Sequence, residues 1–199
     1  MAKKISGTRE TLLDPVSHIF SASLLVTGVL PEGQERRKLL PPTLVASLAP
    51  DADSLSLFFG VHSYAQYHET ITHNFWAAPS LIFLIASLFY FFGSHKNYRS
   101  LLAFSAVGVI FHLLEDLTID WGMAFFWPLS SDTYTLRVIF LTDPFFLMAC
   151  VAGTYFNLRS ARPQSFKKKL SLAILLFSVA YFLGKYFSGD YSTFFPGIK

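Results

Sequence analysis

Histidine and aspartate residues recur at the ends of the apolar stretches of this chain, although 52% of its 199 residues are hydrophobic. The set comprises His18, Asp51, Asp53, His68, His73, His112, Asp116 and Asp143. Ionisable groups in or beside a bilayer are costly unless they pair with one another or bind a metal. Imidazole and carboxylate are common ligands of first-row metal ions. These residue types therefore indicate a metal site on which separate sequence clusters converge.

His112 and Asp116 are four residues apart in an apolar stretch. On a helix this spacing puts both side chains on one face, one turn apart. It suits two ligands of one metal ion, or one ligand with a carboxylate that orients it. The alternative is structural, with His112 bonded to a neighbouring backbone group and Asp116 capping the following loop. Glu115 points elsewhere on such a helix and is interpreted as structural.

His68 and His73 lie in the segment YHETITHN. Five residues apart on one helix they would diverge by roughly 140°, so a shared metal ion requires a turn or a helix start between them. A helix start near Asn74 would supply that turn. The alternative is a pair of ordinary surface histidines.

Asp51 and Asp53 follow Pro50 in the segment APDADSL. Alternate carboxylates in an extended loop can chelate a cation, and they can equally cap a helix N-terminus. Asp143, which precedes Pro144, shares the capping alternative. His18 taken alone does not indicate a metal ligand, and it is a candidate only as a member of the whole set.

The composition favours an integral membrane protein. Aromatic residues make up 17% of the chain and charged residues only 15%, where a soluble domain carries about 25%. The net charge of +3 is small and its basic residues gather in a few loops, which argues against nucleic-acid binding. The single cysteine, Cys150, excludes a disulfide framework and a cysteine-based zinc site. We expect one domain over residues 1–199 and no cleavable signal peptide.

The apolar pattern predicts an all-α fold, a polytopic bundle of membrane helices. Four transmembrane helices are predicted over residues 74–93, 100–117, 143–158 and 170–187. Two shorter apolar helices are predicted over 17–30 and 39–50, about 14 and 12 residues long and below the usual spanning length. These two could be short spans, a re-entrant hairpin, or helices buried against the other four.

The distribution of basic residues predicts an orientation. If all six stretches alternate in direction, the turns 31–38, 94–99 and 159–169 share one side and hold ten Lys and Arg residues. The connections 51–72 and 118–142 on the other side contain only Arg137. By the positive-inside rule the basic turns are cytoplasmic and the His and Asp set faces outward. Lys3, Lys4 and Arg9 would depart from this rule.

Several segments carry a resemblance to a known family. They are DPVSHIFSA, LAPDADSL, HETITHN, HLLEDLTIDWG followed by WPLSSD, and LTDPFF. Their order and spacing resemble the YdjM-like inner-membrane metal-dependent hydrolases, over residues of about 14 to 150. The resemblance implies a multi-helix protein of the bacterial or archaeal cytoplasmic (inner) membrane. The metal site that it implies is formed by His18, Asp51, Asp53, His68, His73, His112 and Asp116.

The chain departs from that family pattern at a few positions. Glu69 and Asn74 replace a basic residue and a serine in the family's HRGxTHS pattern, and Phe111 and Glu115 depart from SHLLLD. The loss of the basic residue weakens the case that the site binds a phosphate, while Glu69 offers a further ligand or a general base. Arg137 could stabilise developing negative charge.

The expected function is hydrolysis of a lipid or lipid-linked ester at the outward membrane face, by water that one or two zinc-like ions activate. Membrane lipids and this substrate are the expected partners, with no nucleic acid. Two alternatives stay open: a non-catalytic protein that binds a metal or transports a cation, and a membrane scaffold whose Phe-rich helices bind another protein.

Overall fold

The computed structural model describes residues 14–119, 122–136, 138 and 143–188. These residues form eight helices and no strand, with a single isolated β-bridge between Met123 and Tyr134. The predicted all-α class is therefore confirmed. In chain order the helices are α1 (Asp14–Val29), α2 (Gln34–Leu48), the 3-10 helix η1 (Pro50–Phe59), α3 (Val61–Tyr67), α4 (Ala77–Phe92), α5 (Tyr98–Asp116), α6 (Pro144–Arg159) and α7 (Gln164–Ser188).

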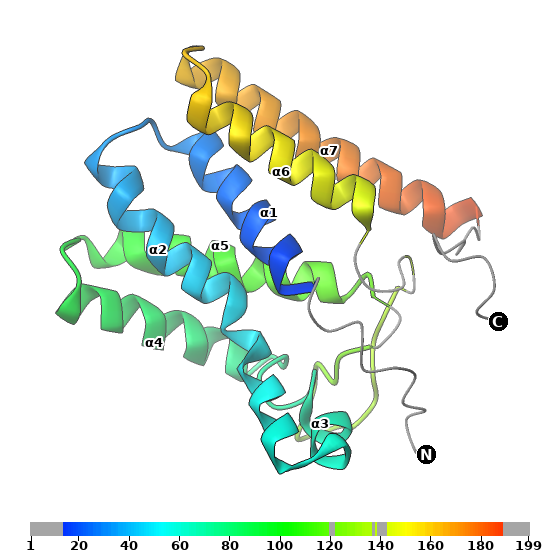
Figure 1. Cartoon of the computed structure of the whole chain (residues 1–199). Helices are drawn as coiled ribbons and strands as arrows, with labels where there is room; N and C mark the ends of the chain where they lie inside the picture. Colours follow the sequence, from blue (N-terminus) through cyan, green and yellow to red (C-terminus); the bar gives the residue numbers. More distant parts are fainter. Residues whose placement is uncertain (1–13, 120–121, 137, 139–142, 189–199) are drawn as a thin grey trace.

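The helices are arranged as three antiparallel pairs. The α1–α2 pair lies in the middle, with α4 and α5 packed against α2 and with α6 and α7 packed against α1 (Figure 1). Buried Leu24, Phe146 and Cys150 form the apolar contact on the α6–α7 side. A second apolar contact on the α4–α5 side is formed by Ala46, Ile85 and Val109. The central pair therefore holds the two outer pairs together.

Among the residues that the structure describes, two helices rather than four are long and apolar enough to cross a membrane. They are α5, with 19 residues, and α7, with 25. The spans predicted over 74–93 and 143–158 correspond to α4 and α6, which have only 16 residues each. In α4 the loss occurs at the N-terminus, because the Asn74 side chain accepts hydrogen bonds from the Trp76 and Ala77 backbone and holds 74–76 in a turn. At about 1.5 Å per residue, 16 residues reach roughly 24 Å, short of a hydrocarbon core of about 30 Å.

The two short N-terminal stretches are also helical. They form α1 and α2, which have 16 and 15 residues, and α2 contains Pro41 and Pro42 in its interior. The connection 51–72 contains two further helical elements, η1 and α3. Gly60, with φ of 105°, joins these two helices through a backbone conformation that other residues rarely adopt.

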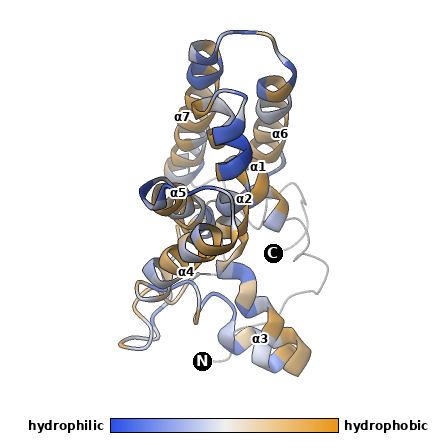
Figure 2. Cartoon of the chain, turned by 90° about the vertical axis from the view of Figure 1, so that its left-hand side faces the viewer, coloured by the Kyte–Doolittle hydropathy of each residue, from blue (hydrophilic) through white to orange (hydrophobic). Residues whose placement is uncertain are grey.

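The outward faces of the outer helix pairs are apolar. Large side chains such as Phe83, Leu84, Leu176 and Phe177 are at least half exposed. Figure 2 shows this hydrophobic colouring along α4 and α7, in contrast to the hydrophilic start of α2. Exposed apolar faces of this extent fit a lipid environment.

Candidate metal centre

Three side chains form the core of a buried cluster at one end of the bundle. His112 Nε2 lies 2.9 Å from Asp116 Oδ2, and His73 Nε2 lies 3.1 Å from the same oxygen. The two Nε2 atoms are 3.0 Å apart. His73 and His112 are fully buried, and Asp116 is 2% exposed. Because His112 and Asp116 are one turn apart on α5 and His73 precedes α4, two segments build this core.

The other ring nitrogen of each histidine is already committed to an acceptor. His112 Nδ1 donates to the Ser47 backbone carbonyl at 2.7 Å, and His73 Nδ1 donates to Asp53 Oδ2 at 3.0 Å. A neutral imidazole has one donor and one acceptor nitrogen, so these bonds make both Nε2 atoms acceptors. With both rings neutral, two lone pairs would face each other and a carboxylate oxygen. Such a contact is favourable only when a proton or a metal ion lies between them.

His18 extends the cluster from α1. Its Nε2 is 3.3 Å from Asp116 Oδ1, and its Nδ1 is 2.9 Å from Glu115 Oε2. The ring also packs against that of His112, with centroids 4.0 Å apart. Glu115 and Asp116 are neighbours in sequence, and the His18 ring lies between their carboxylates.

Asp51 approaches the cluster from the junction of α2 and η1. Its Oδ1 is 3.7 Å from His112 Nε2 and 4.0 Å from His73 Nε2. The Oδ2 atom is buried and accepts no hydrogen bond from any residue that the structure describes. The Asp51 side chain is nevertheless 19% exposed, more than His18, His73, His112 or Asp116. The cluster is therefore most accessible on the Asp51 side.

Asp53 lies outside this core and orients it. Its Oδ2 accepts from His73 Nδ1 and from the Thr72 hydroxyl at 2.7 Å, while its Oδ1 accepts from His68 Nδ1 at 2.8 Å. Both oxygens are thus engaged on the far side of His73. A carboxylate bonded to the second nitrogen of a metal-binding histidine is a common supporting interaction.

The carboxylates make the cluster strongly attractive to positive charge. Burial alone would lower the pKa of His73, but the Asp116 and Asp53 carboxylates against its two nitrogens raise that pKa to about 10. Burial alone would raise the pKa of Asp53, but its bonds to His68 and His73 hold that pKa well below its usual range. Without a metal ion, a proton on His73 provides the positive charge.

The structure separates the candidate ligands into two groups. His18, Asp51, His73, His112 and Asp116 form one group, in which two overlapping triads, His18–Asp51–His112 and His73–His112–Asp116, each bring their candidate ligand atoms within 4.8 Å of one another. Asp53 and His68 bond to each other behind His73 instead. The turn expected between His68 and His73 is present, and it contains Glu69 with φ of 57°.

The helix-capping alternatives have mixed outcomes. The N-cap position of η1 is Ala49, so among the described residues neither Asp51 nor Asp53 is the N-cap of this helix. Asp143 does cap α6, accepting from the Phe145 and Phe146 backbone at 2.9 and 3.0 Å, and it lies apart from the cluster. His112 has the expected backbone bond, through Nδ1 only.

The two residues given catalytic roles are placed differently. Glu69 is 4% exposed, and its backbone carbonyl accepts a hydrogen bond from Ala124, so the loop after α5 packs on this turn. Arg137 lies outside the described residues.

Sequence reasoning missed three supporting groups. They are the Ser47 carbonyl, the Thr72 hydroxyl and the Glu115 carboxylate. Thr72 precedes His73 directly, and this adjacency was an available signal. The sequence predicted that Glu115 points elsewhere and is structural, but its carboxylate contacts His18 from α1, which also reaches Asp116. The role of the Ser47 carbonyl had no signal in the sequence, because any backbone carbonyl could serve.

The donor set fits a divalent metal ion. Imidazole nitrogens and carboxylate oxygens are suitable ligands. Both oxygens of Asp116 and Oδ2 of Asp51 are buried without a described hydrogen-bond donor, although histidine nitrogens lie close to Asp116. Buried carboxylate oxygens left in this state fit a site designed for a cation.

Fold and site together define an all-helical membrane protein with a buried cluster of His and Asp side chains at one end of its helices. The family model of the YdjM inner membrane protein matches residues 13–190. The chain belongs to this family, as its sequence motifs suggested. No curated protein and no solved structure matches the chain.

Proposed function

We propose that this protein is a membrane-embedded, metal-dependent hydrolase. The observation that carries the proposal is the pair of Nε2 atoms of His73 and His112, which face each other and Asp116 while both Nδ1 atoms are bonded elsewhere. Because the Nδ1 atoms are held by hydrogen bonds, the Nε2 atoms are oriented to bind a cation beside Asp116.

His73, His112 and Asp116 would hold the ion, and Asp51 and His18 would complete the site or help to hold a second ion. Zinc is the ion we expect, because the donors are imidazole and carboxylate. When bound, such an ion acidifies water and polarises the bond that is cleaved.

The remaining residues orient the histidine ligands, transfer a proton or stabilise negative charge. Asp53 and the Ser47 carbonyl fix the rings of His73 and His112, so that their Nε2 lone pairs keep one direction. Glu69, which is buried next to His68, is proposed as the general base, and Arg137 is proposed from the sequence to stabilise negative charge. Access on the Asp51 side admits the substrate.

The proposed substrate is a lipid or a lipid-linked ester, because the cluster lies at one end of the membrane helices, where ester groups of lipids lie. The basic turns are at the opposite end, between α1 and α2, α4 and α5, and α6 and α7. The positive-inside rule therefore supports a cluster that faces outward.

Metal analysis of purified protein in detergent is the first test. We expect bound metal in the wild type and its loss in His112→Ala and Asp116→Asn, while His62→Ala on the surface of α3 keeps it. Hydrolysis of a panel of phospholipid and acyl esters, measured with and without a chelator, then tests catalysis. Full metal content in His112→Ala would contradict the site, and metal binding without hydrolysis of any ester would favour a structural metal.

The second candidate function is cation transport. Ion pathways usually place ionisable groups near the middle of the membrane. Here the described cluster lies at one end of the helices, which favours the hydrolase. Metal flux into proteoliposomes would reverse this preference.

A further inference from the structure

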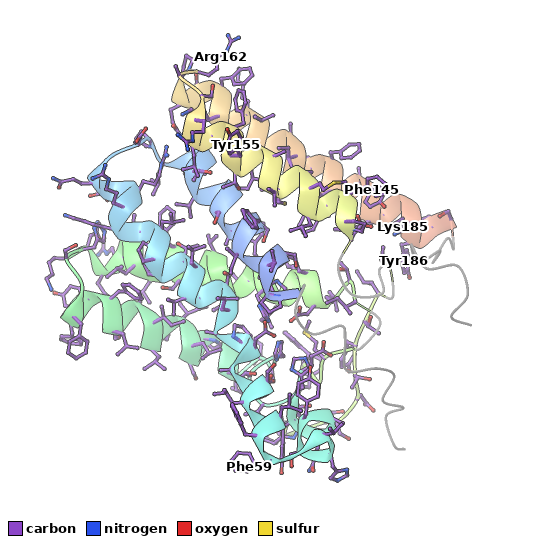
Figure 3. All side chains as sticks on the ribbon, viewed as in Figure 1. Phe59, Phe145, Tyr155, Arg162, Lys185 and Tyr186 are labelled. Carbon is purple, nitrogen blue, oxygen red and sulfur yellow. The ribbon has the colours of Figure 1, made fainter. Side chains whose placement is uncertain are left out.

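The η1–α3 segment projects from the site end of the bundle and exposes apolar side chains. It hangs below the end of α2 in Figure 1, and Figure 3 shows Phe59 at its tip, pointing away from the bundle. Phe58 and Phe59 are 86% and 83% exposed, and Leu55 and Leu57 are at least half exposed. Exposing aromatic side chains to this extent is unfavourable in water, so we expect another apolar surface or phase to bury them.

Beyond Asp51 and Asp53, which belong to the site, this segment carries no full charge. Residues 54–67, SLSLFFGVHSYAQY, contain no Lys, Arg, Asp or Glu. A surface without charge offers nothing to an acidic or basic protein partner, nor to an anionic headgroup. Its Ser and Tyr residues beside Phe and Leu are typical of the membrane interface, where apolar and polar groups meet.

The exposed apolar surface of α4 extends to this end of the bundle. The α4 helix is too short to span, but Phe75 and Trp76 before it are 52% and 54% exposed and continue its lipid-facing surface toward the site. Trp76 has the side chain that is enriched at membrane interfaces. The segment formed by η1 and α3 connects α2 to this same turn, so Phe58 and Phe59 lie at the same end of the bundle as Phe75 and Trp76.

The segment is also bonded to the metal centre. Asp53 of η1 holds His73 through Oδ2, and it holds His68 at the end of α3 through Oδ1. The position of the η1–α3 segment in the membrane therefore affects the position of His73 in the cluster.

We propose that η1 and α3 form a membrane-interface element. Phe58 and Phe59 insert at the boundary between headgroups and acyl chains of the bilayer that surrounds α5 and α7. The element holds the cluster at the depth of lipid ester groups. The link to lipid substrates rests on the proposed function, whereas insertion in the bilayer does not.

A fluorescence experiment tests the insertion. In a Cys150→Ala background, an environment-sensitive label is attached at Phe59→Cys and, as a control, at Gln66→Cys, which is exposed on α3. In phosphatidylcholine vesicles with brominated acyl chains we expect strong quenching at position 59 and weak quenching at 66. Equal quenching at the two positions would overturn the proposal. Efficient crosslinking of position 59 to a second copy, or burial of the label by residues 1–13, would overturn it also.

A double variant tests the consequence for function. We expect Phe58→Ser with Phe59→Ser to keep the wild-type metal content and to lose about tenfold or more in kcat/KM on esters in a bilayer. Activity on a short-chain, water-soluble ester should be retained. Phe91→Ser with Phe92→Ser, an equally exposed aromatic pair at the opposite end of α4, is the matched control.

The two proposals fail in different ways. A wild type that lacks metal and hydrolysis, but is quenched at position 59, would contradict the proposed function and leave the interface element standing. Equal losses in the bilayer and in solution, or loss of metal in the double variant, would overturn the interface element.

Discussion

His73 and His112 approach each other through their Nε2 atoms at 3.0 Å, and each ring is anchored on its opposite side through Nδ1. One anchor is the Asp53 carboxylate and the other is the Ser47 carbonyl. Two acceptor nitrogens at this distance repel each other unless a proton or a metal ion lies between them. The two anchors fix the direction of the Nε2 atoms and so define where a cation would bind.

Replacing Asp53 by Asn should weaken metal binding without removing a ligand. An amide has a single acceptor oxygen, so it cannot accept from His68 and His73 at once as the carboxylate does. Loss of such a supporting bond weakens metal affinity by about 10- to 100-fold. Isothermal titration of metal-depleted protein measures this change. Asp132→Asn, in an exposed loop, should bind as the wild type does, and an unchanged affinity in Asp53→Asn would show that the anchor is unimportant.

Metal affinity should increase with pH. The pKa of His73 is raised to about 10 in the metal-free protein, so at neutral pH an entering ion must displace a proton. Each proton displaced adds a slope of about one log unit in affinity per pH unit. Titrations at pH 6 and pH 8, in buffers of different ionisation enthalpy, measure the slope and the proton release. The exposed His62→Ala variant should keep this slope, and equal affinities at both pH values would contradict the expectation.

Replacing Gly108 by Ala should disturb both packing and the site. An added Cβ would lie 2.5 Å from the Thr43 carbonyl oxygen and 2.8 Å from the Ser47 backbone nitrogen, so α2 must move away from α5. Overpacking of this kind costs about 1–3 kcal/mol, and the movement displaces the carbonyl that anchors His112. The unfolding temperature in detergent and the metal affinity should both decrease.

Gly184→Ala in α7 is the matched control for that change. A Cβ there meets no described atom within 4 Å, and Ala favours a helix by up to about 1 kcal/mol over Gly. Stability should stay the same or rise. Equal destabilisation by the two variants would show that close packing of α2 on α5 is not the cause.

Asp143 should matter for stability and not for metal binding. Besides capping α6, its Oδ2 accepts from Tyr181 at 3.0 Å and from Lys185 at 3.3 Å, which ties α6 to α7. Loss of the cap costs about 1 kcal/mol, and loss of the buried carboxylate leaves the Lys185 charge without its acceptor. Asp143→Ala should lower the unfolding temperature and keep full metal content. A loss of metal in this variant would show that Asp143 contributes to metal binding.

Local patterns in the sequence accounted for the helical class and for much of the cluster. The apolar stretches predicted six of the helices, and the four-residue spacing of His112 and Asp116 placed both on one face of α5. Alternation of the helices brought their polar ends together. These features depend on periodicity and chain direction, which neighbouring residues determine.

Tertiary structure decided which residues face the centre and which stand behind it. Asp51 and Asp53 are two residues apart and chemically identical, yet one lies before the Nε2 atoms and the other bonds to Nδ1 of His73. The orientation of the His112 ring depends on a carbonyl 65 residues away in sequence. Likewise, Asn74 shortens α4 through side-chain bonds that hydropathy does not record. Composition and spacing determined that His and Asp would gather at one end, and long-range hydrogen bonds determined which atoms they present there.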